Sequence, residues 1–195
     1  MNTALVVALV VLWLVVIALV IAVFALARQI GVLYERVAPM GALMLDEGPA
    51  VGSQAPVFEL ASLSGSAASV GKPSGRGELV FFISPTCPVC KKLIPVLRSI
   101  AHAERDWLDV ILASDGVEAE HRTFYAKAGL SDFPYVLSRE LGMTYKVGKL
   151  PYAVLLDEHG KVRAKGLINS REQLESLFTA KELGVESIQE YLQKA

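Results

Sequence analysis

The chain has 195 residues, a formal net charge of −1 and a hydrophobic fraction of 53%. A charge so close to zero gives no electrostatic case for binding nucleic acid, so we expect no nucleic-acid partner. Only two cysteines are present, which excludes a scaffold held by several disulfides, and the length predicts one domain with an appendage.

The first 27 residues hold most of the excess apolar content, and no charged side chain occurs before Arg28. An α-helix needs about 20 apolar residues to cross a bilayer, so residues 3–27 are predicted to form a transmembrane anchor, within a segment that we bound at 1–27. A cleaved signal peptide is the alternative, because Ala25-Leu26-Ala27 is typical of a cleavage site. The anchor is favoured, since signal peptides have a shorter apolar region that follows a basic one.

Residues 28–50 are predicted to be a juxtamembrane linker, because Pro39, Gly41 and Gly48 interrupt regular structure. A soluble domain is predicted over residues 51–195. Its first part includes a stretch rich in Gly and Ser, residues 64–77, which we interpret as turns and a loop.

Two buried strands and a helix are predicted next. Leu79–Ile83 is a continuous apolar run, which predicts a strand buried on both faces. A helix is predicted over 88–103, because apolar residues recur at helical spacing after a proline that suits the first turn. Pro95 is predicted to kink this helix. Asp109–Ser114 is predicted to be a second strand, parallel to the first through a right-handed crossover.

The rest of the chain predicts a helix, a hairpin and a last helix. The helix covers residues 118–128, and the hairpin joins strands at 151–156 and 161–166. Ser170 is predicted to cap the last helix of the domain, and a short tail helix follows at 186–194. Together these elements predict an α/β fold, with a mixed sheet covered by helices on both faces.

The two cysteines, Cys87 and Cys90, lie at the predicted junction of the first strand and its helix. Unpaired N–H groups and the helix dipole stabilise a thiolate there, and cysteines in such settings have pKa values lowered to about 3.5–7.5. We predict that Cys87 is the attacking thiolate and Cys90 the resolving thiol, with no cofactor beyond this redox-active disulfide. Pro88, Val89 and the positively charged Lys91 are predicted to modulate the pair.

Three alternatives for the cysteines are weaker. A structural disulfide would close a very short loop and add only about 2 kcal/mol. A zinc site needs four ligands, which only His102, His121 and His159 could complete, and His121 is too distant for a finger-like motif. The cysteines could also be two inert buried thiols. We therefore interpret the three histidines as surface or turn residues and expect no metal.

Two segments resemble thioredoxin. Cys87–Leu97, with the sequence CPVCKKLIPVL, resembles the active-site helix, whose pattern is Cys-x-x-Cys-Lys-x-x-x-Pro-x-Leu. Tyr145–Val162 resembles the segment that leads into a cis-proline, a hairpin and the last strand. The resemblance implies a thioredoxin-like fold, in which Pro151 is a cis-proline packed against the disulfide and Leu150 presents its backbone to an extended substrate. An ordinary proline at the start of a strand is the alternative.

Two residues depart from the thioredoxin pattern. Thr86 stands where thioredoxins carry Trp before the first cysteine, and Phe81 stands where they carry a buried acid. Without that acid, proton transfer at Cys90 lacks its usual base. This departure argues against a general thioredoxin-like reductase.

The whole chain resembles the thioredoxin-like accessory proteins of methylamine utilisation. The shared features are the N-terminal anchor and the segments Gly52–Leu60, Ser84–Lys91 and Lys149–Gly160. That family is required for making methylamine dehydrogenase, a periplasmic enzyme whose small subunit is dense in disulfides and carries a quinone made from its own tryptophans. The resemblance implies that this subunit is the client, whose disulfides the protein forms, isomerises or protects. Turnover would also need a redox partner that recycles the cysteine pair.

Two signals disagree about the location of the soluble domain. Arg28 and Arg36 follow the predicted anchor and no Lys or Arg precedes it, which by the positive-inside tendency favours the cytoplasm. The resemblance implies a single-pass inner-membrane protein with its domain in the periplasm, where a client's disulfides persist. We expect the periplasmic orientation, because two arginines are a weak bias.

Two other functions fit the same sequence. The domain could be a non-catalytic chaperone or export adaptor for the same subunit, in which case the cysteines would be dispensable. It could also be a thiol reductase in cytochrome c maturation, which the missing buried acid disfavours.

Overall fold

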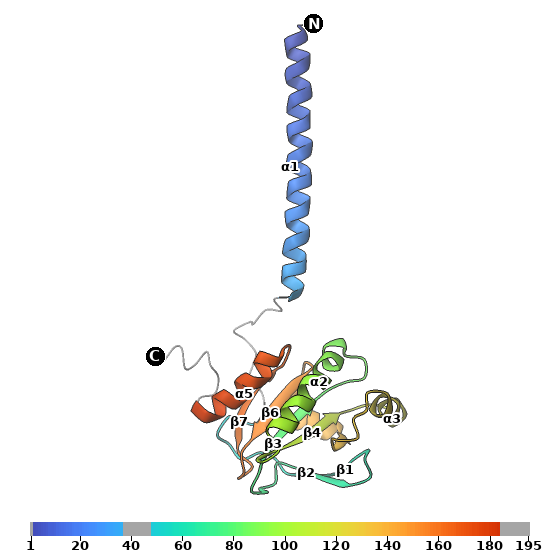
Figure 1. Ribbon diagram of the computed structural model, residues 1–195, viewed down its shortest axis with the longest axis vertical. Helices are drawn as coiled ribbons and strands as arrows, with labels where there is room; N and C mark the ends of the chain where they lie inside the picture. The colour runs from blue at the N-terminus through green and yellow to red at the C-terminus, as the bar shows by residue number, and fades with distance from the viewer. Residues whose placement is uncertain (1, 37–47, 184–195) are drawn as a thin grey trace. The chain divides into compact units, whose positions relative to one another are not determined.

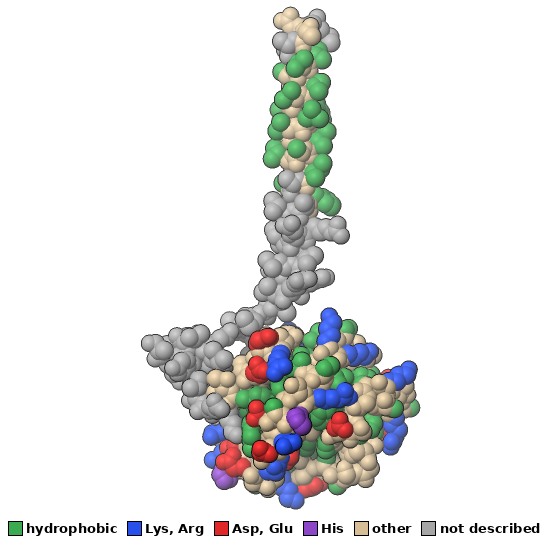
Figure 2. All heavy atoms as spheres, in the orientation of Figure 1, with side chains coloured by type: hydrophobic (Ala, Val, Ile, Leu, Met, Phe, Trp, Pro, Cys, Tyr) green, Lys and Arg blue, Asp and Glu red, His purple; other side chains and the backbone are tan. Residues whose placement is uncertain are grey.

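The computed structural model describes residues 2–36 and 48–183. The chain divides into two units, Met1–Leu45 and Asp46–Ala195. The first unit contains helix α1 (Thr3–Arg36), shown in Figure 1. The described side chains of α1 between Val6 and Phe24 are apolar and exposed, and they form the green surface of this helix in Figure 2.

No helix among the described residues combines the length and the apolar character that crossing a membrane requires. The transmembrane anchor over residues 3–27 stays a prediction. Helix α1 continues to Arg36, into the predicted linker. Residues 37–47 of that linker and the tail helix predicted over 186–194 lie outside the described residues.

The second unit contains all the strands that the structure describes, together with four helices (Figure 1). In chain order its elements are β1 (Phe58–Ala61), β2 (Ala67–Val70), β3 (Gly77–Phe82), α2 (Pro88–Ala103), β4 (Leu108–Ser114), α3 (Glu118–Lys127), β5 (Tyr135–Leu137), α4 (Arg139–Thr144), β6 (Tyr152–Leu156), β7 (Val162–Leu167) and α5 (Arg171–Leu183).

A five-stranded sheet in the order β5-β4-β3-β6-β7 forms the centre of the domain. Strands β3, β4 and β5 are parallel to one another, whereas β6 pairs antiparallel with both β3 and β7. The parallel pairing of β3 with β4 across helix α2 confirms the predicted strand–helix–strand unit. The sheet is therefore mixed, as predicted, and β1 and β2 form a separate antiparallel pair beside it.

Two apolar clusters cover the two faces of this sheet. Leu79 and Phe81 of β3 pack with residues of α2, α3 and α5, and Figure 1 shows α2 and α5 over the same face. Val80 and Phe82 pack on the opposite face with residues of α4 and of the β1–β2 pair. Because successive side chains of a strand point to opposite faces, β3 must be apolar nearly throughout to serve both clusters.

The sequence missed four elements, β1, β2, β5 and α4. The Gly and Ser content of residues 64–77 indicates turns and a loop, but this stretch contains β2, whose small residues give a weak strand signal. This strand forms because β1 pairs with it and because Ala68 and Val70 are buried. In contrast, α2 has the predicted bounds, and Ser170 caps α5 by accepting a hydrogen bond from the Gln173 N–H at 3.3 Å.

Candidate active site

The register between β3 and β6 brings two distant segments to one edge of the sheet. Phe82, the last residue of β3, pairs with Tyr152, the first residue of β6. The turn that follows β3 and the residue that precedes β6, Pro151, therefore lie at the same edge. The Leu150–Pro151 peptide bond is cis, as the resemblance implied. Pro151 is buried and Leu150 is exposed, and their part in substrate binding stays a prediction.

A compact turn connects β3 to helix α2. The hydroxyls of Ser84 and Thr86 are hydrogen-bonded at 2.9 Å, and the Thr86 N–H donates to Ser84 Oγ at 3.3 Å. The Cys87 N–H donates to the Ser84 carbonyl at 3.1 Å. Short polar side chains form such local bonds to the backbone readily, so the sequence Ser-Pro-Thr suits this turn. The turn places Cys87 at the start of α2.

Cys87 is the N-cap residue of α2. Its backbone is extended, and its Sγ accepts a hydrogen bond from the Cys90 N–H at 3.1 Å. Pro88 occupies the first turn, where its missing N–H removes no helical bond, and the first turn contains no acidic residue. The positive end of the helix dipole therefore acts on Cys87 without a neighbouring carboxylate in the helix to oppose it.

Cys87 and Cys90 form a disulfide, with their Cα atoms 5.3 Å apart. Cys90 is fully buried in the apolar cluster beneath α2, whereas Cys87 is half-buried. An incoming sulfur therefore meets Cys87 first. The predicted roles, in which Cys87 reacts with the substrate and Cys90 resolves the product, stay a prediction.

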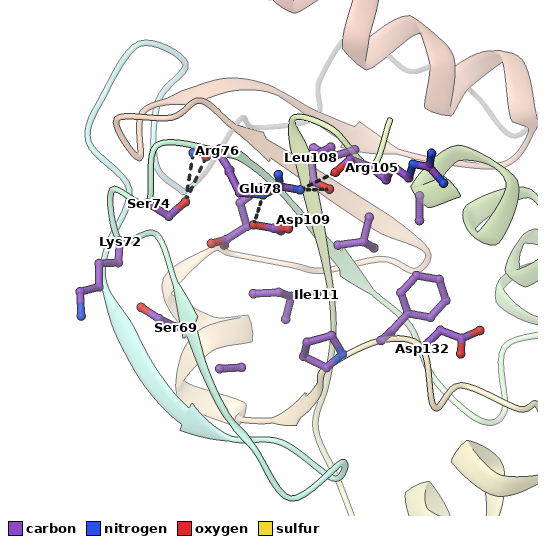
Figure 3. Close-up of a pocket in the computed structure, with 15 residues that line it drawn as sticks. Ser69, Lys72, Ser74, Arg76, Glu78, Arg105, Leu108, Asp109, Ile111 and Asp132 are labelled. Atoms are coloured by element: carbon purple, nitrogen blue, oxygen red, sulfur yellow. Dashed lines mark hydrogen bonds and ion pairs between the residues drawn. The ribbon is translucent and has the colours of Figure 1, made fainter. Parts of the chain in front are cut away.

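No buried carboxylate among the described residues shares the apolar cluster of Cys90. Phe81 occupies the position of the thioredoxin acid, and it is buried in that cluster. The buried acids of the described part of the chain are Glu78 and Asp157. Glu78 alternates with Leu79 and so faces the opposite side of the sheet, where it lines a pocket beside Asp109 (Figure 3).

Sequence comparisons place this site in a known family. Residues 50–181 match the Redoxin family model. Methylamine utilization protein MauD from Methylorubrum extorquens is 49% identical over 185 residues, which cover 94% of this chain and 89% of that protein. The chain belongs to the MauD family. MauD from Paracoccus denitrificans is 44% identical over 194 residues, which cover 98% of this chain and 96% of that protein.

Comparison of structures agrees with the family assignment. The thioredoxin domain of a thiol-disulfide oxidoreductase from Bacteroides vulgatus matches with a TM-score of 0.57 and 25% identity, covering 65% of this chain and 96% of that one. The predicted thioredoxin-like α/β fold is thus confirmed. This MauD-family protein is a thioredoxin-like member of the thiol-disulfide oxidoreductases, with a role in methylamine utilization.

Among the described residues of this MauD-family chain, no group of three or more His, Cys, Asp or Glu side chains could hold a metal ion. His102 and His159 are exposed, as predicted. The surface interpretation of His121 is wrong, because its side chain is buried between α3 and β5. The sequence offered one weak signal, since His121 lies three residues before the buried Phe124 on one helix face.

His121 connects the loop after β4 to the core of the MauD-family domain. Its Nε2 lies 2.9 Å from the Asp115 carbonyl oxygen, and its Nδ1 lies 2.7 Å from the Tyr135 hydroxyl. Because a carbonyl can only accept, Nε2 carries a proton and donates to Asp115, and in the tautomer with its proton on Nε2 the ring accepts from Tyr135 at Nδ1. Burial raises the pKa of Tyr135 to about 12, so its hydroxyl stays protonated and can donate.

Replacing His121 with Leu is expected to lower the free energy of unfolding of the MauD-family protein by about 2 kcal/mol. The variant removes the hydrogen bonds that His121 makes to the buried Tyr135 hydroxyl and to the Asp115 carbonyl. Urea unfolding measures the change. The control is His102→Leu, which replaces an exposed side chain of α2 and should change the free energy of unfolding by no more than about 0.5 kcal/mol. Equal effects of the two substitutions would contradict the structural role of His121.

Proposed function

We propose that this MauD-family protein is a thiol-disulfide oxidoreductase that acts in the maturation of the disulfide-rich small subunit of methylamine dehydrogenase. One observation carries the proposal. A half-buried Cys87 caps a helix while its disulfide partner Cys90 is fully buried beneath it. This arrangement suits repeated opening and closing of a disulfide, and the likeness to proteins of methylamine utilization supports the choice of client.

The oxidation of a client is a pair of sulfur exchanges. A client thiolate attacks Cys87 Sγ, which forms a mixed disulfide, breaks the Cys87–Cys90 bond and releases Cys90 as a thiolate that takes up a proton. A second client thiolate then attacks the client sulfur of the mixed disulfide, and Cys87 leaves as a thiolate. Two electrons pass from the client dithiol to the cysteine pair, and a redox partner must remove them before the next cycle.

The same cysteine also permits isomerisation. A Cys87 thiolate attacks an incorrect client disulfide and forms a mixed disulfide, and another client thiolate then releases Cys87 while a new client disulfide forms. No net electrons are transferred in this case. Both reactions use Cys87 as nucleophile or leaving group, and its N-cap position favours the thiolate in each role.

We also propose that residues 3–27 anchor the protein in the inner membrane, with the thioredoxin-like domain in the periplasm. The absence of charged side chains before Arg28 supports the anchor, because the run exceeds the roughly 20 residues needed to cross a bilayer. The cysteine pair supports the periplasmic side, since disulfides persist in oxidising compartments.

A trapping experiment tests the client and the compartment together. Cys90 can also resolve a mixed disulfide at Cys87 by attacking Cys87 Sγ, which releases the client thiol. Cys90→Ala removes this route and leaves only release by another client thiol, so we expect the mixed disulfide to accumulate in cells grown on methylamine. Acid quenching, alkylation and mass spectrometry identify the attached protein. We expect the small subunit of methylamine dehydrogenase, recovered in the membrane fraction and digestible by protease added to spheroplasts.

The trap also separates the competing functions. The matched control is Cys87→Ser/Cys90→Ala, which has no reactive sulfur and must capture nothing. Capture mainly of proteins of cytochrome c maturation would favour the reductase instead. Capture of no protein, in cells that still mature the dehydrogenase, would favour the non-catalytic chaperone or adaptor.

A further inference from the structure

A groove of about 710 Å³ opens at the edge of the sheet that carries the active site. Ile83, the residue that follows β3, and Leu150, the residue that precedes Pro151, both line it. The other walls come from the end of β4, from α4 and from the loop that leads to β6. Since the active-site turn and Pro151 lie at this same edge, a chain that reacts at Cys87 can continue into the groove.

Positive charge predominates along the groove. Among the described residues its lining includes Arg139, Lys146 and Lys149, and Asp115 is the single acid. Arg139 and Lys149 are exposed, and neither forms an ion pair with the part of the chain that the structure describes. Exposed charges of one sign along a groove attract a partner of the opposite sign and accelerate its encounter.

Apolar surface lies beside these cations. Met143 is 62% exposed and Leu150 is 38% exposed, and both line the groove. Leucine and methionine at the surface offer contact area for an apolar side chain of a partner, and methionine adapts to different shapes. The lining thus combines cations for carboxylates with apolar contacts, at the same edge of the sheet as the active-site turn.

The walls of the groove are held in place by the core. Helix α4 is capped by Ser138, whose Oγ accepts a hydrogen bond from the Leu141 N–H at 3.1 Å. Leu141 and Tyr145 of the same segment are buried against the sheet, so Arg139 and Met143 project from a fixed support. A binding surface that is already ordered loses less entropy when a partner binds.

We propose that this groove binds an extended acidic segment of the client polypeptide that also carries an apolar residue and lies next to the reacting client cysteine. The proposal rests on the proposed function and names the class of substrate that it uses. Arg139 and Lys149 pair with carboxylates of the segment, and Met143 and Leu150 contact its apolar side chain. Charge thereby selects the client, while Cys87 performs the exchange.

The test uses the full-length protein in a non-ionic detergent, with its cysteine pair oxidised. Rates of thiol–disulfide exchange are measured with peptides of one design, in which a cysteine and a leucine are flanked by acidic, neutral or basic residues. Arg139→Glu/Lys149→Glu is compared with Arg105→Glu/Lys161→Glu, which makes the same change of net charge. Arg105 and Lys161 are exposed and lie near the opposite edge of the sheet, before β4 and before β7.

We expect the groove variant to react about tenfold more slowly with the acidic peptide and faster with the basic one, whereas the control changes either rate less than about twofold. The difference should shrink in 0.5 M salt, because salt screens exposed charges. The reduced forms of all three proteins should react equally with hydroxyethyl disulfide, a neutral reagent that reports on Cys87 alone.

The outcomes separate the two proposals. Equal rates of the wild type and the groove variant with the acidic peptide, alongside normal reaction with hydroxyethyl disulfide, would overturn the groove proposal and leave the oxidoreductase intact. Failure of the wild type to exchange with every peptide and with hydroxyethyl disulfide would overturn the proposed function, and the groove proposal with it.

Discussion

Replacing Cys87 with Ser is expected to abolish maturation of methylamine dehydrogenase, reducing its activity to that of cells without this protein. A serine hydroxyl forms no disulfide, so neither oxidation nor isomerisation of a client can start. The measurement is dehydrogenase activity in cell extracts, together with the amount of small subunit. The fold should persist, because the disulfide closes a short loop and contributes only about 2 kcal/mol.

Two controls make this result interpretable. Thermal unfolding of the purified variant must show a cooperative transition, which separates loss of chemistry from loss of structure. His102→Leu, an exposed change on α2 away from the cysteines, should leave dehydrogenase activity unchanged. Normal enzyme levels in cells that produce Cys87→Ser would contradict the oxidoreductase, and normal levels with both cysteines replaced by Ala would favour the chaperone.

The wild-type protein is expected to lose stability as the pH rises from 5 to 8, and replacing Glu78 with Gln should remove most of that loss. Burial raises the pKa of Glu78 to about 7, and the negative charge of Asp109 adds to this effect, while a hydrogen bond from the Gly71 N–H opposes it. A free glutamate has a pKa of about 4.3. Between these values the folded state binds more protons than the unfolded state, so stability falls as pH rises.

The expected size of this loss is about 2–3 kcal/mol across the interval, because one unit of pKa shift corresponds to about 1.4 kcal/mol. Gln keeps a carbonyl oxygen for the Gly71 N–H but has no charge to bury. Urea unfolding at pH 5, 6, 7 and 8 should therefore give Glu78→Gln a flatter profile than the wild type. The control Glu140→Gln changes an exposed carboxyl and should keep the wild-type slope. Parallel profiles for Glu78→Gln and the wild type would rule out this role.

The hydrogen bond to Glu78 depends on a glycine. Gly71 has a φ of 78°, in the left-handed region that favours glycine, and a Cβ there would overlap the Pro56 carbonyl oxygen. This close approach brings the Gly71 N–H to Glu78 Oε1 at 3.2 Å. Glu78 also lines the pocket shown in Figure 3, whose walls come from three separate segments, within residues 68–78, 101–111 and 132–134.

The elements that the sequence predicted well are those with a strong local signal. Helix α2 has its predicted bounds because its apolar spacing and Pro88 act within the helix itself. The cysteine pair was predictable for the same reason, since two residues of separation place both sulfurs on one turn. In contrast, β5 has only three residues and exists because β4 offers it an edge to pair with. Helix α4 has six residues and forms because Leu141 and Tyr145 are buried.

The sequence by itself predicted the chemistry proposed for this protein, because Cys87 and Cys90 form a local pattern at one helix terminus. It also indicated the family, through segments that are continuous in the chain. Only the tertiary structure decided the environments of Glu78 and His121. Glu78 is buried beside Gly71, and His121 of α3 is buried against Tyr135 of β5. The charged groove likewise exists only because the sheet brings α4, the end of β4 and Leu150 to one edge. No local sequence pattern predicts that these three segments lie close together.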